Sequence, residues 1–455
     1  MTSFMHAESL HRLIKHAIDS GAAKSIAEAE AMFRGYCLSI EISLDAATDP
    51  VHQASLLTAV ALGRRVFLGG VSVAGDLNVD LAIQLPLGRT LADAVLALGG
   101  SWQAATAGTP TIIIGGGTTS RRDGFCIRTA NAGWRGGILP VHSELAPVAG
   151  PPVPLAGMLS GALAINEAYL FVNGGTPAAG RRAVGLSLWQ PDAEVDWLSA
   201  DPREPTLTYL PSRLWLIGLG HLGQAYLWGL SLLPYQRPAE VSLVLQDIDI
   251  ITPSTESTSV LSDASLIGMK KTRAMAAWAE RRGFDSAIQE RLFDATFTRQ
   301  PAEPTIALCG LDNAAGRRAL DRVGFDLVVE AGLGRGHRNF RTMRLHTLPN
   351  CRPASEIWKA PTKQESVEDR PAYTRLMAEG SLDRCGMTLL AGKAVGAPFV
   401  GAVAGALVIS EVLRVLHGGA AHQFIDIDLL SLEQRTSAEH QHDFSRLNPG
   451  FALAV

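Results

Sequence analysis

The sequence predicts an α/β protein made of two Rossmann-like halves, and three observations support this prediction. The chain has 455 residues, more than one ordinary hydrophobic core can hold, so two large units are expected. Hydrophobic residues make up 47% of the chain, charged residues 18%, and there are 45 glycines, a composition typical of parallel sheets buried on both faces. The stretch 214–249 supplies an apolar run, a glycine turn, a helical segment and a second apolar run that ends in acids, as in a nucleotide-binding βαβ unit.

Charge and hydropathy narrow the class of partner. The net charge is −4, with acids and bases interspersed, so no basic surface for nucleic acid or an anionic membrane is evident. The N-terminal stretch 1–20 mixes charges without an apolar centre, unlike a signal peptide. The longest apolar run, 394–409, is shorter than the roughly 20 residues that a membrane span requires. We therefore expect a cytoplasmic protein that binds a protein or a small molecule.

The five cysteines are far apart, odd in number, and contain no C-x-x-C pair. This pattern argues against a disulfide framework and against a four-cysteine zinc site. Cys37, Cys126 and Cys309 are expected in the core.

The N-terminal half also follows βαβ order. Its apolar periodicity predicts two short helices within 8–36, strands at 39–44, 64–73 and 110–114, and helices at 51–61, 90–98 and 155–168. No G-x-G-x-x-G opens a helix here, so this half is predicted to be a degenerate copy. The prolines and acids of 191–211 predict a linker, which divides the chain into domains 1–200 and 201–455.

The C-terminal half opens with the glycine loop. Gly218 allows the tight turn, Gly220 lets backbone N–H groups approach a phosphate, and Gly223 lets the helix pack on the strand. Asp247 ends the second strand, where its carboxylate can accept hydrogen bonds from ribose hydroxyls. By itself, this unit predicts a bound nucleotide but does not indicate which reaction the protein catalyses. The alternative is a glycine turn that only packs a helix on a strand in some other α/β protein.

The elements that follow continue the same order. A Ser/Thr-rich stretch, 251–266, precedes a helix that starts near Gly268. Strands are predicted at 305–309, 327–330 and 343–347, then a polar surface segment at 350–380, one or two helices within 388–416 broken near Pro398, and a final strand at 424–430.

Three motifs in this order resemble the adenylating superfamily of ubiquitin-activating enzymes and their bacterial ThiF/MoeB relatives. The chain has D-I-D at Asp247–Asp249, G-M-K-K at Gly268–Lys271 and D-N-A-A-G-R at Asp312–Arg317. The resemblance extends roughly over 213–417, and the ordered set is far more specific than any one motif.

The resemblance implies ATP and Mg²⁺ as cofactors and a site for both. Asp312 would bind or position Mg²⁺, Lys271 would contact the phosphates, and Asp247 would hold the ribose. The other implied nucleotide-binding residues are Gly218, Gly220, Gly223, Asp249, Asn313 and Arg317. Simpler roles stay open: a solvated Lys271, a turn-forming Asp249, a helix cap at Asn313 and a surface charge at Arg317.

Cys385 is the catalytic cysteine that the resemblance implies. In thioester-forming members, a cysteine followed by glycine lies on a segment, here about 350–390, that crosses over before the last helices. Its thiolate would attack the acyl-adenylate, and Arg384 would lower the pKa of the thiol. A buried structural role is the alternative, and Cys351 is the second candidate nucleophile.

The sequence departs from the family in the segment after D-I-D. Family members place an asparagine and an arginine there to contact the phosphates, whereas this chain has only hydroxyl groups, Glu256 and Pro253 at 252–259. Either another cation compensates, such as Arg335 or one from the N-terminal half, or adenylation is weakened.

The complete pattern predicts a bacterial ubiquitin-activating-like enzyme. An inactive adenylation-like half followed by an active one resembles the eukaryotic enzymes and the compact activators of bacterial ubiquitin-like conjugation operons, some of them linked to phage defence. It would adenylate the C-terminus of a ubiquitin-like protein, form a thioester on Cys385 and pass the acyl group to a conjugating enzyme. The alternatives are an adenylation-only activator of a sulfur carrier, an NAD-dependent dehydrogenase and a non-catalytic scaffold; a homodimer is also possible.

Overall fold

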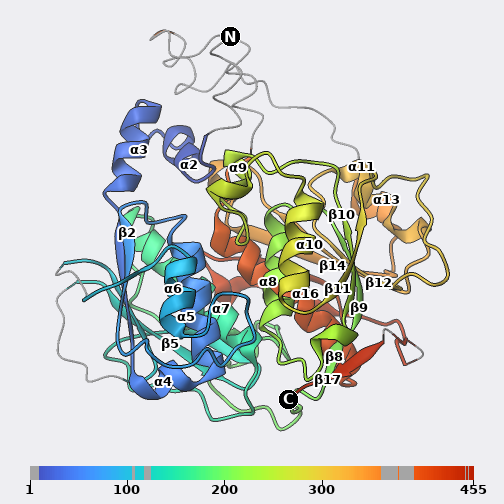
Figure 1. Cartoon of the computed structure of the whole chain (residues 1–455), viewed down its shortest axis with the longest axis horizontal. Helices are drawn as coiled ribbons and strands as arrows, with labels where there is room; N and C mark the ends of the chain where they lie inside the picture. Colours follow the sequence, from blue (N-terminus) through green and yellow to red (C-terminus); the bar gives the residue numbers. More distant parts are fainter. Residues whose placement is uncertain are drawn as a thin grey trace.

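Two mixed β-sheets, one in each half of the chain, form the framework of the computed structural model (Figure 1). The structure describes residues 10–104, 108–116, 124–359, 378, 394–445, 447–448 and 450–455. The N-terminal sheet has the order β3-β2-β1-β4-β5-β6-β7, and the C-terminal sheet has the order β11-β10-β9-β12-β13-β14-β15-β16. Numbered from its own first strand, the N-terminal sheet reads 3-2-1-4-5-6-7 and the C-terminal sheet reads 3-2-1-4-5-6-7-8, so the two halves share one topology apart from an added edge strand. The predicted α/β class with two sheets is confirmed.

In both sheets the first five strands are parallel and the later ones are antiparallel. The N-terminal strands are β1 (Cys37–Ile42), β2 (Gly70–Ala74), β3 (Ser101–Trp102), β4 (Thr111–Ile114), β5 (Cys126–Ala132), β6 (Arg135–Pro140) and β7 (Val184–Ser187). The C-terminal strands are β9 (Arg213–Ile217), β10 (Ser242–Gln246), β11 (Asp285–Gln289), β12 (Ile306–Cys309), β13 (Leu327–Leu333), β14 (Thr342–Leu348), β15 (His422–Asp428) and β16 (Thr436–Glu439).

Helices cover the sheets and begin where the sequence supplies caps. The N-terminal helices are α2 (Ile14–Asp19), α3 (Ile26–Arg34), α4 (Leu44–Thr48), α5 (Pro50–Gly63), α6 (Leu91–Ala97) and α7 (Pro154–Val172). The C-terminal helices are α8 (His221–Leu232), α9 (Pro253–Glu256), α10 (Lys271–Arg281), α11 (Ala314–Arg317), α12 (Gly336–Asn339), α13 (Ala354–Ile357) and α16 (Pro398–Leu416). The Asp49 carboxylate caps α5 by accepting from two backbone N–H groups, and prolines start α5, α7 and α16, where no intrahelical donor is needed.

Four long helices join the two halves at the centre (Figure 1). Helix α7 packs on α5, α16 packs on α8, and α7 and α16 pack on each other. Glycine permits the closest approach, since a Cβ atom on Gly157 would lie 2.2 Å from the Val51 carbonyl oxygen. The same buried cluster includes residues of both sheets, so the halves share one hydrophobic core.

Both α7 and α16 are long and apolar enough to cross a membrane by length and composition. However, 89% of the most apolar window of each helix is buried inside the protein. Their position in the shared core accounts for this composition.

The segment that connects the halves is held by buried charges. The Arg135 guanidinium lies 3.0 Å from the Glu204 carboxylate, and both side chains are almost fully buried. Arg414 of α16 donates to the Leu188 carbonyl and pairs with Glu411. The predicted division at residue 200 remains a prediction, because this segment packs against both halves and the core is shared.

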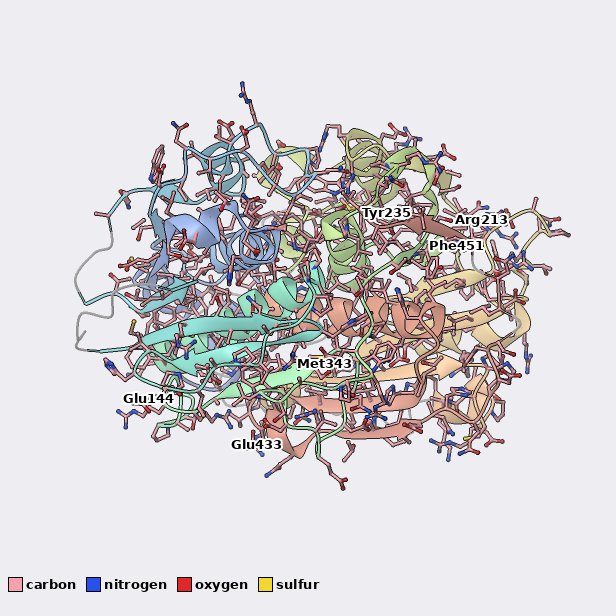
Figure 2. All side chains as sticks on the ribbon, turned by 90° about the horizontal axis from the view of Figure 1, so that it is seen from below. Glu144, Arg213, Tyr235, Met343, Glu433 and Phe451 are labelled. Carbon is pink, nitrogen blue, oxygen red and sulfur yellow. The ribbon has the colours of Figure 1, made fainter. Side chains whose placement is uncertain are left out.

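A two-stranded sheet lies beside the start of β9. It pairs β8 (Tyr209–Pro211) with β17 (Phe451–Leu453), and an isolated bridge joins Tyr235 to Ala454. From below, Arg213, Tyr235 and Phe451 are seen together on the C-terminal half, far from Glu144 on the N-terminal half (Figure 2).

Some elements differ from their predicted form. The 64–73 segment is a strand only from Gly70, because its first part turns back from α5. The glycine-rich stretch 133–137, for which no strand was predicted, belongs to a β5–β6 hairpin, and two short strands follow the one predicted as final. Pro398 starts a helix and does not interrupt one.

Candidate nucleotide site

The candidate site lies at the carboxyl ends of β9 and β12. In the C-terminal sheet, the chain moves outward from β9 to β10 and β11 on one side and to β12 and β13 on the other, so the strand order reverses between β9 and β12. Crevices at such reversal points are where open α/β sheets bind ligands. Gly218 follows β9 and Gly310 follows β12, and a Cβ atom on Gly218 would lie 3.1 Å from the Gly310 carbonyl.

The three loop glycines have different surroundings. Gly218 has a φ of +81°, the left-handed region that favours glycine. A Cβ atom on Gly223 would lie 2.0 Å from the Gly218 carbonyl oxygen, so this glycine lets α8 pack on the loop. A Cβ atom on Gly220 would meet nothing within 4 Å, and this glycine precedes the first turn of the 12-residue helix α8. Open space before a helix N-terminus suits a phosphate.

Asp247 holds the glycine loop. One of its carboxylate oxygens accepts a hydrogen bond from the Leu219 backbone N–H at 2.7 Å, and the other accepts from the Asp249 N–H at 2.8 Å. Its side chain is only 9% exposed, whereas that of Asp249 is 63% exposed. Of the two carboxylates, Asp249 is therefore the more accessible to a ligand, and Asp247 is the one that orders the loop.

Lys271 lies between these two acids. Its ammonium is 2.9 Å from the Asp249 carboxylate and 3.6 Å from that of Asp247, and its side chain is 11% exposed. A bridge between Ile250 and Lys270 places this start of α10 beside the end of β10. Lys271 is thus no solvated surface lysine, and it brings a positive charge to the edge of the crevice.

Asp312, Asn313 and Arg317 follow β12, but they do different things. Asp312 is exposed at the strand end, and its backbone carbonyl accepts from Arg335 at 3.0 Å. Asn313 caps α11 by accepting from the Gly316 N–H at 2.7 Å. Arg317 pairs with the buried Glu330 at 2.8 Å. The cap considered for Asn313 is therefore present, and Arg317 is not a plain surface charge.

The donor set is suitable for magnesium only together with a nucleotide. Among the residues that the structure describes, no group of three His, Cys, Asp or Glu side chains could hold a metal ion by itself. Mg²⁺ commonly takes one or two protein carboxylates and completes its ligands with phosphates and water. The exposed carboxylate of Asp312, across the crevice from the glycine loop, is compatible with that mode.

Arginines of the N-terminal half reach the hydroxyl-rich segment after D-I-D. The Arg12 guanidinium donates to Ser254 Oγ at 3.4 Å, and its backbone N–H donates to Ser257 Oγ at 3.1 Å. Arg65 donates to the carbonyl oxygens of Glu256 and Val260. Sequence reasoning anticipated a cation from this half but gave no residue, because contacts across more than 190 residues leave no local pattern.

The corresponding position of the N-terminal sheet holds a short helix that no glycine loop precedes. There the strand order reverses between β1 and β4, and helix α4 lies at this position. A Cβ atom on Gly115, which follows β4, would lie 2.4 Å from the Ala46 Cβ and 2.6 Å from Ser43 Oγ. Gly310, the equivalent glycine after β12, is packed similarly, since its Cβ atom would lie 2.8 Å from the Leu222 Cβ. The halves therefore differ in the open Gly220 before α8, which α4 lacks, and not in this contact.

The cysteines differ in their surroundings. Cys385, the predicted nucleophile, lies outside the described residues. Cys351 is exposed, and its thiol donates to Gln423 Oε1 at 3.0 Å. Burial raises the pKa of the Cys309 thiol to about 12, so it is a poor nucleophile. Cys126 is buried as predicted, but the core prediction for Cys37 is wrong, because this residue begins β1 and is exposed at the end of the strand.

Comparisons with known proteins identify the family. Residues 37–188 match the model of the BilD N-terminal domain, and residues 210–419 match that of the BilD C-terminal domain. The bacterial E1-like protein BilD of Collimonas sp. (strain OK412) is 44% identical over 420 residues, which cover 92% of this chain and 90% of that protein.

Solved structures of E. coli MccB are more distant. The complex of MccB with MccA-N7isoASN is 12% identical with a TM-score of 0.36, and the match covers 51% of this chain and 66% of that one. The complex of MccB with ATP is 14% identical with a TM-score of 0.34, and the match covers 51% and 64% of the two chains. The chain thus spans just under two thirds of the MccB length. From the match over nearly its whole length to the Collimonas protein, the chain belongs to the BilD family of bacterial E1-like proteins.

Proposed function

We propose that this protein uses ATP to adenylate the C-terminal carboxylate of a ubiquitin-like protein. The observation that carries the proposal is that the open Gly220, the Asp247–Lys271 pair and the exposed Asp312 all follow the carboxyl ends of neighbouring parallel strands. These groups come from the ends of β9, β10 and β12, in a chain of the E1-like family.

The reaction needs positive charge along the phosphates. A carboxylate oxygen of the ubiquitin-like protein attacks the α-phosphorus of ATP, the α–β phosphoanhydride bond breaks, and pyrophosphate leaves. The α8 N-terminus and Lys271 would stabilise the negative charge that develops there. A Mg²⁺ ion held by Asp312 would add a second charge on the phosphate oxygens.

The base would lie on exposed apolar side chains next to Asp247. Ile248, Ile288 and Leu292 are 41%, 45% and 52% exposed, and they follow or end the neighbouring strands β10 and β11. A purine stacked on these side chains would place its ribose near Asp247 and Asp249.

Arg12 is the cation that we assign in place of the absent family arginine. It contacts the segment in which that arginine would stand, and its charge also acts on His221, the first residue of α8. If Arg12 compensates in this way for the missing arginine, adenylation need not be weakened.

The second proposed step is a thioester. The Cys385 thiolate attacks the acyl carbonyl of the adenylate, the acyl–phosphate bond breaks, and AMP leaves. A cytoplasmic conjugating enzyme would then accept the acyl group. Cys351 is the alternative nucleophile, since it is exposed and belongs to the same segment of the sequence, 350–390.

Two measurements test the proposal. Purified protein, ATP and a ubiquitin-like protein encoded beside it should support exchange of labelled pyrophosphate into ATP and form a thiol-labile adduct. The adduct should be lost in Cys385→Ala and kept in Cys351→Ala, while exchange continues in both. Exchange without any adduct would favour an adenylation-only activator, and no exchange with a bound partner would favour a scaffold.

A further inference from the structure

Glu330 is a buried carboxylate that the proposed chemistry does not use. It lies in β13 with an exposed fraction of 0%, and a charge at such a position is costly unless it is paired. Two partners meet it. Arg317 Nε is 2.8 Å from one carboxylate oxygen, and the His346 ring, directly opposite on β14, is 3.5 Å from the other.

Arg317 connects this carboxylate to the loop that carries Asp312. The Nε–H of Arg317 donates to the Leu311 carbonyl at 2.9 Å, and Nη2 donates to the same oxygen, so the contact with Glu330 is an ion pair without a hydrogen bond. Leu311 directly precedes Asp312. A Cβ atom on Gly332 would lie 3.0 Å from Arg317 Nη1, so glycine at that position leaves room for the guanidinium.

The next two residues of the loop are held as well. Arg335 Nη2 donates to the Asp312 carbonyl at 3.0 Å, and Asn313 accepts from the Gly316 N–H at 2.7 Å. The carbonyl groups of Leu311 and Asp312 and the side chain of Asn313 are thus held, while Asp312 itself is exposed.

We propose that Glu330 is a positioning residue that sets the Asp312 carboxylate through Arg317. Glu330 orients the guanidinium, the guanidinium fixes the Leu311 carbonyl, and the following carboxylate then faces the crevice. Arg317 in this arrangement is a support for the site and makes no contact with the nucleotide. The inference rests on the proposed function, in which Asp312 acts on Mg²⁺-ATP.

The test is a double-mutant cycle on the binding of Mg²⁺-ATP, measured by calorimetry. Glu330→Gln keeps the size of the side chain but removes its charge, and it should weaken binding about 10-fold, as loss of supporting groups around metal ligands does. In an Asp312→Asn background the same change should cost less than about twofold, because the group it positions is already gone. Asp426→Asn, which removes an exposed pair with Arg344 on the same sheet, should leave binding unchanged in both backgrounds.

Arg317→Lys provides a second cycle if Glu330→Gln does not fold. It keeps the charge but loses the planar fork, so it should also weaken binding only while Asp312 is present. If the variant weakened Mg²⁺-ATP binding by the same factor in the wild-type and Asp312→Asn backgrounds, the inference would be overturned. Such a result would indicate a general structural role or a direct nucleotide contact. A wild-type protein that binds no ATP would instead overturn the proposed function, and this inference with it.

Discussion

Gly223 approaches Gly218 so closely that a Cβ atom on the first would lie 2.0 Å from the carbonyl oxygen of the second. The contact joins the first turn of α8 to the end of β9, and backbone atoms on both sides leave little freedom to relax. By contrast, Gly220 between them faces open space.

Substitution by alanine should have different effects at Gly223 and at Gly220. Gly223→Ala should destabilise the protein by about 1–3 kcal/mol, because the added methyl group overpacks the loop. Gly220→Ala should change stability by less than about 0.5 kcal/mol but lower ATP affinity about 10-fold, because the methyl group occupies the space for phosphate. Urea unfolding and calorimetric titration separate the two, and a stability loss in Gly220→Ala would contradict the assignment of its surroundings.

Lys271→Met should weaken ATP binding and also destabilise the protein. Loss of the ammonium leaves the largely buried Asp247 without its counter-charge, at a cost of about 1–3 kcal/mol. Lys270→Met is the matched control, since the ammonium of this neighbouring lysine donates to the Ile248 carbonyl and not to Asp247 or Asp249. Equal losses of affinity in both variants would argue against a specific role of Lys271.

His16 predicts that stability falls as the solution is acidified. Burial, followed by the charge of Arg341, lowers the pKa of His16 to about 4 in the folded protein, against about 6.5 when unfolded. Between these values the unfolded chain binds the proton and the folded chain does not, so stability declines from pH about 6.5 to about 4, by up to about 3 kcal/mol from this group.

His16→Gln tests the pH effect. Glutamine carries no charge at any of these pH values and can still bond the Tyr169 hydroxyl, which lies 3.1 Å from His16 Nδ1. The slope of unfolding free energy against pH should therefore be shallower in His16→Gln. The exposed His442→Gln should follow the wild type, and an unchanged slope in His16→Gln would refute the prediction.

The buried charges of α16 predict a large mutational cost. Arg414 and Glu411 are paired with exposed fractions of 0% and 1%, and the His422 ring is 3.3 Å from the same carboxylate. Arg414→Met should cost about 3–5 kcal/mol, because it leaves Glu411 buried and unpaired. Arg344→Met removes an exposed pair with Asp426 and should cost less than about 1 kcal/mol, and a similar cost in both variants would count against the role of burial.

The positions of most strands and helices could be predicted from local sequence patterns. Apolar runs and caps located β9, β12 and α10 to within a few residues, and parallel topology then brought Gly218, Asp247 and Asp312 to one sheet edge. The roles of these residues toward ATP stay predictions. The β5–β6 hairpin was missed because its glycine cluster, 133–137, has the composition of a loop.

Contacts between distant segments could not be predicted in this way. Arg12 meets Ser254 only because the two halves fold together. The contact of Gly115 with Ala46 of α4 likewise joins segments that are far apart in the sequence. The Glu330–Arg317 pair was missed for another reason, since a single acid inside an apolar strand has no periodicity of its own.

The repeated topology, with α7 packed against α16 at the centre, makes the single chain resemble a dimer of two similar subunits. Unlike a dimer of identical subunits, it has a glycine loop before α8 in one half and the short helix α4 at the corresponding position of the other. Titration should accordingly saturate at one nucleotide per chain, without the cooperativity that two equal sites would permit. The half without the loop would then be constrained mainly by the residues that pack on its neighbour, such as Arg12, which donates to Ser254 of the other half.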